Sequence, residues 1–167
     1  SQQKIFTLGD KALIIWEDAR QSYTGNQIYF QIIRPDKTLL LPVNGKPITV
    51  YSGRNQTSFS AVVTPSNQIA VTWYEDLYDT SKVYAQLISS TGEYLWGDHG
   101  IEISPTGSIY QKYPQISYEN GYFYVGWSDL DVNDVNNFIF RVKGQKLDSA
   151  GNHLWGENGK MISESPF

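Results

Sequence analysis

An internal repeat of about 55 residues, present three times, constrains this chain more than any other feature. One glutamine anchors each copy. A leucine follows it nine residues later, a second large apolar residue ten later, a glycine fourteen later and an isoleucine seventeen later. These residues are Gln31, Leu40, Leu41, Gly45 and Ile48, then Gln86, Leu95, Trp96, Gly100 and Ile103, then Gln145, Leu154, Trp155, Gly159 and Ile162. The regular spacing predicts three equivalent structural units.

Each copy contains four stretches with the pattern of short β-strands. Apolar residues alternate with others along the second stretch, as at Ile69, Val71 and Trp73. Turn-forming residues separate the stretches, and none shows the 3.6-residue period of a helix. We therefore expect an all-β protein with almost no helix. The strands are expected near 4–8, 12–17, 27–33, 38–41 and 46–50, then 59–64, 68–75, 82–88, 93–96 and 101–104, then 114–119, 122–128, 138–147, 152–155 and 160–163.

Four-stranded antiparallel units that recur every 40–55 residues or so are typical of β-propeller blades. A lone sheet of this kind exposes two apolar faces, and stacked neighbours bury them. The recurring Trp16, Trp73 and Trp127 supply large areas for such stacking. We predict three propeller blades at about residues 1–54, 55–109 and 110–167. A β-sandwich of roughly 12 strands is the alternative architecture.

Three blades cannot close a ring, because closed propellers have about four to eight. Either two chains pair as a homodimer, each supplying half of a six-bladed propeller, or further blades of a longer parent chain complete the ring. The chain begins before a first strand and ends after a last one, which favours the self-assembling half-propeller. The first copy has Lys37 where the others have Gly92 and Gly151, so we expect it to face a different neighbour.

Composition excludes several classes of function. The net charge is −4 and the Lys and Arg residues are scattered, so no basic face for nucleic acid is expected. The chain has no cysteine, which excludes disulfides and thiolate metal sites. No apolar run approaches the roughly 18–20 residues that span a bilayer. We expect no cofactor and no membrane span.

The repeat resembles one found in large secreted proteins of bacteria. The family pattern is Trp-x-Asp-x-Arg, a polar loop, Ile-Tyr-Ala-Gln, and then Gly-x-x-Leu-Trp-Gly. The matching segments are Trp16-Glu17-Asp18-Ala19-Arg20, Ile28-Tyr29-Phe30-Gln31, Val83-Tyr84-Ala85-Gln86 and Gly92-Glu93-Tyr94-Leu95-Trp96-Gly97. The resemblance covers nearly the whole chain. It implies a propeller-like module of a secreted or cell-surface bacterial protein, and it implies no catalytic residue.

Two groups of acidic residues are candidate sites. Residues 129–137 are rich in Asp and Asn, as in calcium loops, but Asp134 and Phe140 stand where such a loop has glycine and glutamate. A polar turn is the other interpretation. Asp18, Asp76 and Asp129 could act as glycosidase carboxylates. Because one follows each tryptophan, we expect them instead to bind backbone N–H groups, and we predict no catalytic residue and no metal ligand.

Aromatic residues in or beside the predicted loops are the candidate ligand-binding residues, because sugars and protein partners both use such side chains. They are Tyr23, Tyr74, Tyr78, Tyr110 and Tyr113. The alternative is that they pack against strand edges. The preferred prediction is a non-enzymatic binding or structural module that engages a glycan or a protein and self-associates. The alternative is a glycoside-active propeller enzyme.

Overall fold

The computed structural model describes residues 2–20, 25–50, 53–77, 79–103, 110–130 and 140–163. Over these ranges the chain is all-β, as predicted, and no helix in them is long and apolar enough to cross a membrane. The strands are β1 (Gln3–Leu8), β2 (Lys11–Asp18), β3 (Gln27–Ile33), β4 (Lys46–Pro47), β5 (Asn55–Val63), β6 (Ile69–Leu77), β7 (Thr80–Ile88), β8 (Ile101–Glu102), β9 (Tyr110–Glu119), β10 (Tyr122–Leu130), β11 (Phe140–Leu147) and β12 (Lys160–Ser163).

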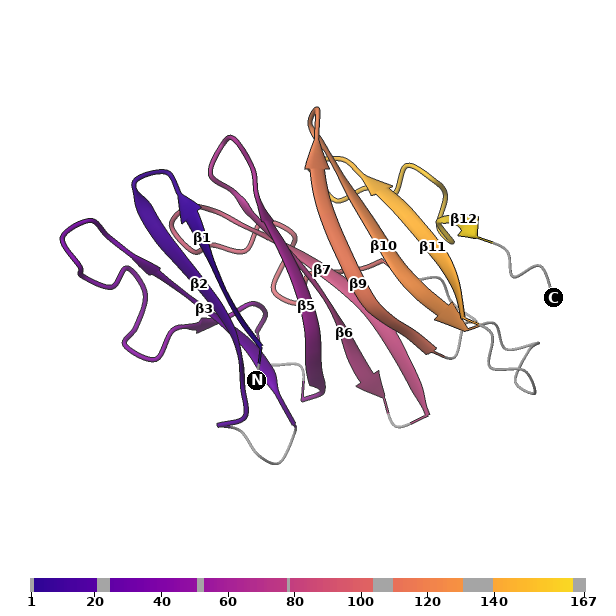
Figure 1. Ribbon diagram of the computed structural model, residues 1–167, viewed down its shortest axis with the longest axis horizontal. Coiled ribbons are helices and arrows are strands. Elements are labelled where there is room, and N and C mark those ends of the chain that lie inside the picture. Colours follow the sequence, from indigo (N-terminus) through magenta and orange to yellow (C-terminus); the bar gives the residue numbers. More distant parts are fainter. Residues whose placement is uncertain are drawn as a thin grey trace.

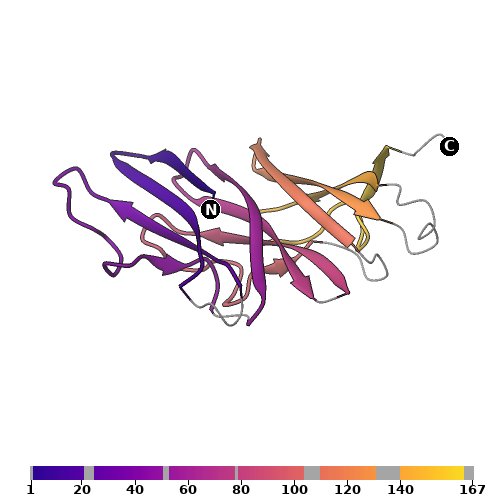
Figure 2. The same ribbon diagram turned by 60° about the horizontal axis from the view of Figure 1, so that its bottom comes forward.

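Consecutive strands pair antiparallel in groups of four. Strands β1 to β4 form one sheet in chain order, which we call the first unit. Strands β5 to β8 form the second unit and β9 to β12 the third, and a parallel bridge between Ser81 and Tyr110 joins these two into one larger sheet. The units lie side by side along the long axis of the molecule (Figure 1). Their sheets are strongly twisted (Figure 2).

The repeat glutamines attach the last segment of each unit to its third strand. The Gln86 side chain donates to the carbonyl of Gly97 (2.7 Å) and accepts from the backbone N–H groups of Trp96 and Leu87 (both 3.1 Å). Gln31 and Gln145 make the same contacts in their own units. These glutamines act within a unit, because the loop before the short last strand otherwise lacks partners for its backbone groups.

The last segment of each unit is less regular than predicted. Only a single bridge forms in its first half, as between Ile88 and Tyr94. A turn then brings the repeat glycine against the tryptophan ring and the third strand. A Cβ atom on Gly100 would lie 2.4 Å from the carbonyl oxygen of Ala85 and 3.1 Å from the Trp73 ring. Glycine is therefore required here by close approach, and Gly45 and Gly159 have equivalent surroundings.

The hydrophobic cores lie between units, where facing sheets meet. The first core joins Leu13, Ile15 and Phe30 of the first unit to Phe59 and Trp73 of the second. The second core, likewise built from facing strands, contains Ala70, Val83, Trp96, Phe123 and Trp127. Successive residues of β6 thus face opposite neighbours, since strand side chains alternate between the faces of a sheet. Each unit depends on its neighbour for burial.

We predict that Gly100→Ala destabilises the fold far more than Gly97→Ala. Both glycines have positive φ, 71° and 77°, but a Cβ on Gly97 would meet no atom within 4 Å. The conformational cost alone should lower the free energy of unfolding by about 1 kcal/mol for Gly97→Ala. The added clash should bring Gly100→Ala to about 3 kcal/mol. Urea unfolding of both variants measures the difference, and equal losses would show that the close packing is unimportant.

Candidate functional site

A carboxylate two residues after each tryptophan accepts the indole N–H. Asp18 accepts from Trp16 (2.9 Å), Glu75 from Trp73 (3.3 Å) and Asp129 from Trp127 (3.3 Å). Each carboxylate also has a cation beside it: Arg20, Arg54 and Lys143 respectively. The hydrogen bond from Arg20 holds the pKa of Asp18 well below its usual value. These pairings recur in all three units, and Asp18 also accepts from the Arg20 backbone N–H (2.9 Å), the kind of donor that the sequence analysis expected for these aspartates.

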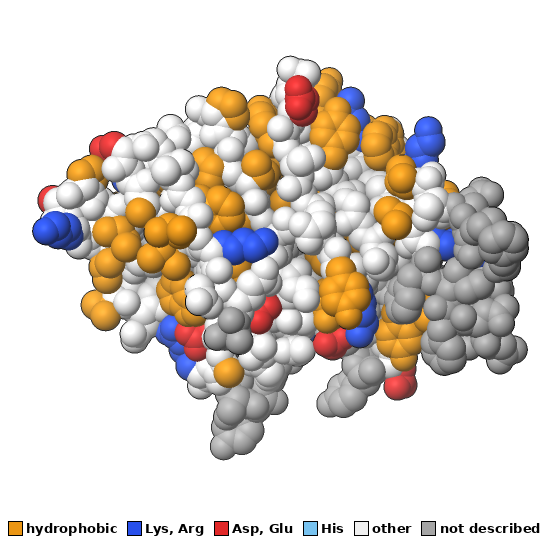
Figure 3. Space-filling model, in the orientation of Figure 1, with side chains coloured by type: hydrophobic (Ala, Val, Ile, Leu, Met, Phe, Trp, Pro, Cys, Tyr) orange, Lys and Arg blue, Asp and Glu red, His pale blue; other side chains and the backbone are white. Residues whose placement is uncertain are grey.

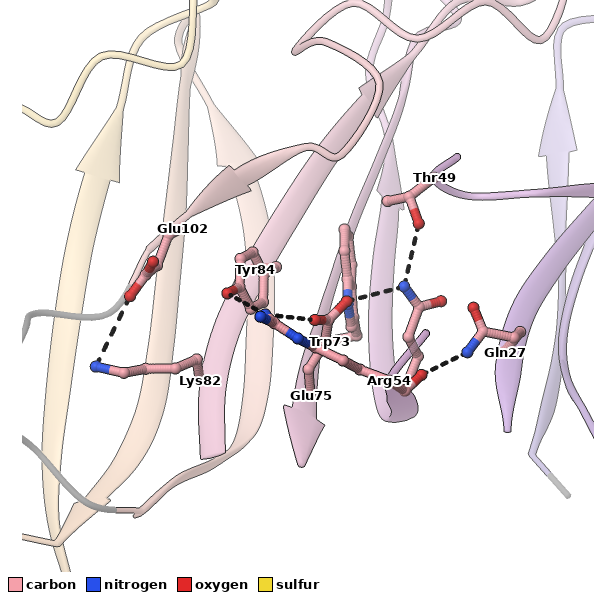
Figure 4. A network of polar contacts seen from close by, with 9 residues as sticks. Gln27, Thr49, Arg54, Trp73, Glu75, Lys82, Tyr84 and Glu102 are labelled. Carbon is pink, nitrogen blue, oxygen red and sulfur yellow. Dashed lines mark hydrogen bonds and ion pairs between the residues drawn. The ribbon is translucent and has the colours of Figure 1, made fainter. Parts of the chain in front are cut away.

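Figure 4 shows this arrangement around Glu75, which is 4% exposed. The Glu75 carboxylate accepts from the Gln56 side chain (3.0 Å), which in turn donates to Thr49 of the first unit (3.1 Å). The backbone N–H of Ile28, also in the first unit, donates to the Gln56 side-chain oxygen (3.3 Å). The network satisfies the buried charge while linking two units, which is a stabilising role.

Asp76 does not belong to this set, which corrects the sequence analysis. Glu75 occupies the position of Asp18 and Asp129 in the second unit, and Asp76 lies one residue further along β6. Its side chain is 39% exposed. Asp76 is thus a carboxylate that the repeat does not account for.

Strained bulges interrupt the first strands of the second and third units. The pairing of β5 with β6 shifts between Thr57 and Ser60, and that of β9 with β10 shifts at the equivalent place. Ser58 has φ of 54° and Tyr113 has φ of 56°, a region that residues other than glycine rarely adopt. Strained residues and bulges cluster at functional sites. Strands β5 and β9, which carry the two bulges, also contact each other, and this brings the bulges to one side of the molecule.

The residue after Trp16 and the residue after Trp73 each point to the bulge of the next unit. Glu17 accepts from the Ser58 backbone N–H (2.8 Å) and from the Thr57 hydroxyl (3.1 Å). Tyr74, at the equivalent position of the second unit, contacts the Tyr113 ring edge-on with centroids 6.0 Å apart. This follows from strand alternation: the tryptophan faces the preceding unit, so the next residue must face the following one.

Asp76 and Lys112 complete the group. The Lys112 ammonium lies 3.7 Å from the Asp76 carboxylate and 5.4 Å from the centre of the Tyr74 ring. The Asn55 side chain also donates to Asp76 (3.2 Å). We call this group the bulge cluster. Its members are Glu17, Asn55, Thr57, Ser58, Tyr74, Asp76, Lys112 and Tyr113.

The surroundings of Tyr74 raise its pKa. Burial raises this pKa above its usual value, and the negative charges of Asp76 and, more weakly, Glu17 raise it further. A hydrogen bond with Ser58 acts in the opposite direction. The contacts agree with this: Thr57, which pairs with Tyr74, donates to Glu17, and Lys112 contacts both Asp76 and the Tyr74 ring. Tyr74 is 7% exposed and Tyr113 beside it is 59% exposed.

Three of the tyrosines singled out in the sequence analysis lie in strands: Tyr74 in β6, Tyr113 in β9, and Tyr110 at the start of β9. Tyr23 and Tyr78 lie outside the described residues. Sequence reasoning missed Glu17, Ser58 and Lys112. Strand alternation after the tryptophan could have pointed to Glu17, but no sequence signal marked the bulges.

Most of the segment considered as a calcium loop lies outside the residues that the structure describes. Of residues 129–137, only Asp129 and Leu130 are described, and Asp129 pairs with Lys143 at 2.9 Å. Within the described ranges, no group of three or more His, Cys, Asp or Glu side chains could hold a metal ion.

Comparison with solved structures identifies the fold. The chain is similar to an endo-arabinase from Bacteroides thetaiotaomicron (TM-score 0.57, 13% identity, 97% of this chain and 61% of that one). It is also similar to the α-L-arabinanase of Penicillium chrysogenum (0.62, 9%, 96% and 52%) and to a family-43 endo-arabinanase of Bacillus licheniformis (0.52, 11%, 98% and 59%). These neighbours are five-bladed propellers, and the likeness is in fold. The chain thus has a propeller-like fold and spans about three fifths of the bacterial enzymes.

The sequence itself matches no protein-family model and no curated protein. The structural neighbours nevertheless correct the functional prediction. We had expected a non-enzymatic module, and all three neighbours described above are glycoside hydrolases. That finding overturns the non-enzymatic prediction and favours its alternative, a glycoside-active propeller.

We predict that Asp76→Asn lowers the pKa of Tyr74, because it removes the larger of the two negative charges that disfavour the phenolate. Glu17→Gln should lower it by less. Asp148→Asn, at an exposed turn of the third unit, is the control and should leave the value unchanged. NMR titration of tyrosine labelled at Cζ measures each pKa. An unchanged Tyr74 pKa in Asp76→Asn would show that the carboxylates do not converge there.

Proposed function

We propose that this chain supplies three blades of a five-bladed, glycoside-active propeller and that the bulge cluster lines its sugar-binding cleft. The observation that carries the proposal is the set of contacts around the two bulges: Glu17 of the first unit accepts from Ser58, Asp76 pairs with Lys112, and Tyr74 contacts the exposed Tyr113. Three of five blades agrees with the 61% and 59% of the bacterial arabinanases that the chain covers. Two further blades would complete the ring.

The chemistry of the cluster suits a glycan. Hydrolysis of a glycosidic bond uses carboxylates on either side of the reacting carbon. The Asp76 side chain is 39% exposed, so a substrate can reach it, and the Lys112 ammonium lies 3.7 Å from its carboxylate. Glu17 is held by the Ser58 and Thr57 donors and positions the bulge. The Tyr113 ring offers a face on which a sugar ring can stack.

The substrate we propose is an arabinose-containing polysaccharide, since arabinanases share the fold. A polymer of this kind is too large to enter a cell, which supports the expectation of a secreted or surface protein. The other blades would supply the rest of the cleft and the second reacting group.

We predict that migration of the chain is slowed in a native gel containing linear arabinan, and that the protein with its ring of blades complete releases reducing sugar from that polymer. Asp76→Asn should lower the hydrolysis rate by about 100-fold or more, the usual scale for loss of an acid–base group. Asp148→Asn, which lies away from the cluster, should leave the rate unchanged. Reducing-end assays measure these rates, and equal rates in both variants would exclude Asp76 as the reacting carboxylate.

A second prediction tests binding alone. Tyr113→Ala removes the exposed ring and should weaken gel retardation about tenfold, the scale of one stacking contact. Tyr122→Ala, at the opposite end of the third unit, removes a ring that is 36% exposed and is the matched control. If the chain neither binds nor cleaves arabinan, the proposed substrate is wrong.

A further inference from the structure

The third unit has an apolar face that no residue in the described part of the chain covers. Side chains on β9 to β12 surround a hollow of about 330 Å³. Among them Trp155 is 37% exposed, Val142 44% and Ile162 58%. The lining of this hollow includes Ser117, Tyr124, Val142, Trp155 and Ile162, and we call the surface that they form the outer face.

The equivalent face of the second unit shows how such a surface is covered. Trp96 occupies the position of Trp155 there and is only 5% exposed. Its ring meets Phe123 of the third unit edge-on at 5.3 Å, and its indole N–H donates to the Ser149 carbonyl (3.1 Å). Trp96 is therefore buried by an aromatic ring and a turn, both from the following unit.

A glycine in that turn makes room for the tryptophan. A Cβ on Gly151 would lie 3.2 Å from two atoms of the Trp96 ring and 3.0 Å from Ile101. The first interface has the same construction, since a Cβ on Gly92 would lie 2.6 Å from the Leu41 side chain. Both observed interfaces thus favour glycine at this turn position, where φ is 86° at Gly151 and 91° at Gly92 and a side chain would crowd the neighbouring unit.

The first unit lacks these features on its own exposed side. It has Lys37, with φ of 70°, where the other units have glycine. It also has Ala12 four residues before its tryptophan, where the third unit has Phe123. The first unit does expose hydrophobic side chains, such as Ile5 at 71% and Val43 at 83%, and such side chains gather over this end of the molecule (Figure 3). Its surface is apolar but is not shaped to receive Trp155.

We propose that the outer face is covered by a further unit of this repeat, with glycine at the position of Gly151 and an aromatic residue at the position of Phe123. The first unit of a second copy is a poorer match, because it has Lys37 and Ala12 where the third unit has the glycine and the phenylalanine that cover Trp96. This occupant rests on the proposed function only in that the blades of a propeller stack. It differs from the homodimer expected from the sequence, because the neighbouring blade must have particular residues at two positions.

The test uses a single engineered cysteine, Ser117→Cys, on the outer face of a chain that has no other cysteine. The chain is extended at its end by a second copy of residues 104–167, which carries the glycine and the phenylalanine. The rate at which a thiol reagent labels the introduced cysteine should fall about tenfold in the extended chain, because covered sites react only when they open. The same extension with Gly151→Lys in the added copy should label as fast as the unextended chain.

Ser66→Cys, at an exposed turn of the second unit, controls for general effects and should label equally in all chains. Unslowed labelling of the Ser117→Cys variant in both extended chains would overturn the proposal, and equal slowing in both would overturn the glycine requirement.

Sedimentation equilibrium of the unextended chain is independent of the extension. A mass of twice 19.0 kDa that is lost in Trp155→Ala would make the second copy the occupant instead. None of these measurements depends on glycan hydrolysis, so a negative result here would leave the proposed glycoside activity untouched, and loss of that activity would leave the blade packing untouched.

Discussion

Stacking of two-faced sheets is the constraint on which this structure depends. A unit of four strands here has apolar side chains on both faces, so it cannot bury them without a neighbour on each side. Trp73 faces the first unit while Ala70 faces the third, and both cores lie between units. The stacking in turn requires a compact edge. Gly100 allows the last segment to close over the Trp73 ring, and Gln86 attaches that segment to β7.

The candidate site arises from the same stacking. Because strand side chains alternate, the residues after Trp16 and Trp73 must point toward the next unit, and Glu17 and Tyr74 do so. They meet strained bulges on β5 and β9, where Ser58 and Tyr113 adopt positive φ. The bulges occupy equivalent places in the second and third units, but the residues that meet them differ, whereas the repeat explains the carboxylates Asp18, Glu75 and Asp129. Chemistry is therefore to be expected where the copies differ.

Much of the fold could be predicted from the sequence, because the repeat spacing and strand alternation are local. The positions of β2, β6 and β10 follow from apolar alternation that ends in tryptophan. The irregular last segment was less predictable, since its backbone is satisfied by a side chain ten residues away, Gln86 for Trp96. The sequence analysis assigned Asp76 as the equivalent of Asp18 and Asp129. The structure shows that Glu75 is the equivalent residue, because it accepts the hydrogen bond from the Trp73 indole.

The sequence by itself determined the all-β class, the repeat and the residues that build each unit, because these depend on periodicity and on turn chemistry. Only the tertiary structure decided which side chains meet. Glu17 and Asp76 are 59 residues apart in the chain, and they share an electrostatic environment because neighbouring sheets stack with their first strands in contact. The structure also gives a physical reason why Lys37 in place of the repeat glycine matters, since glycine at that turn makes room for the neighbour's side chain.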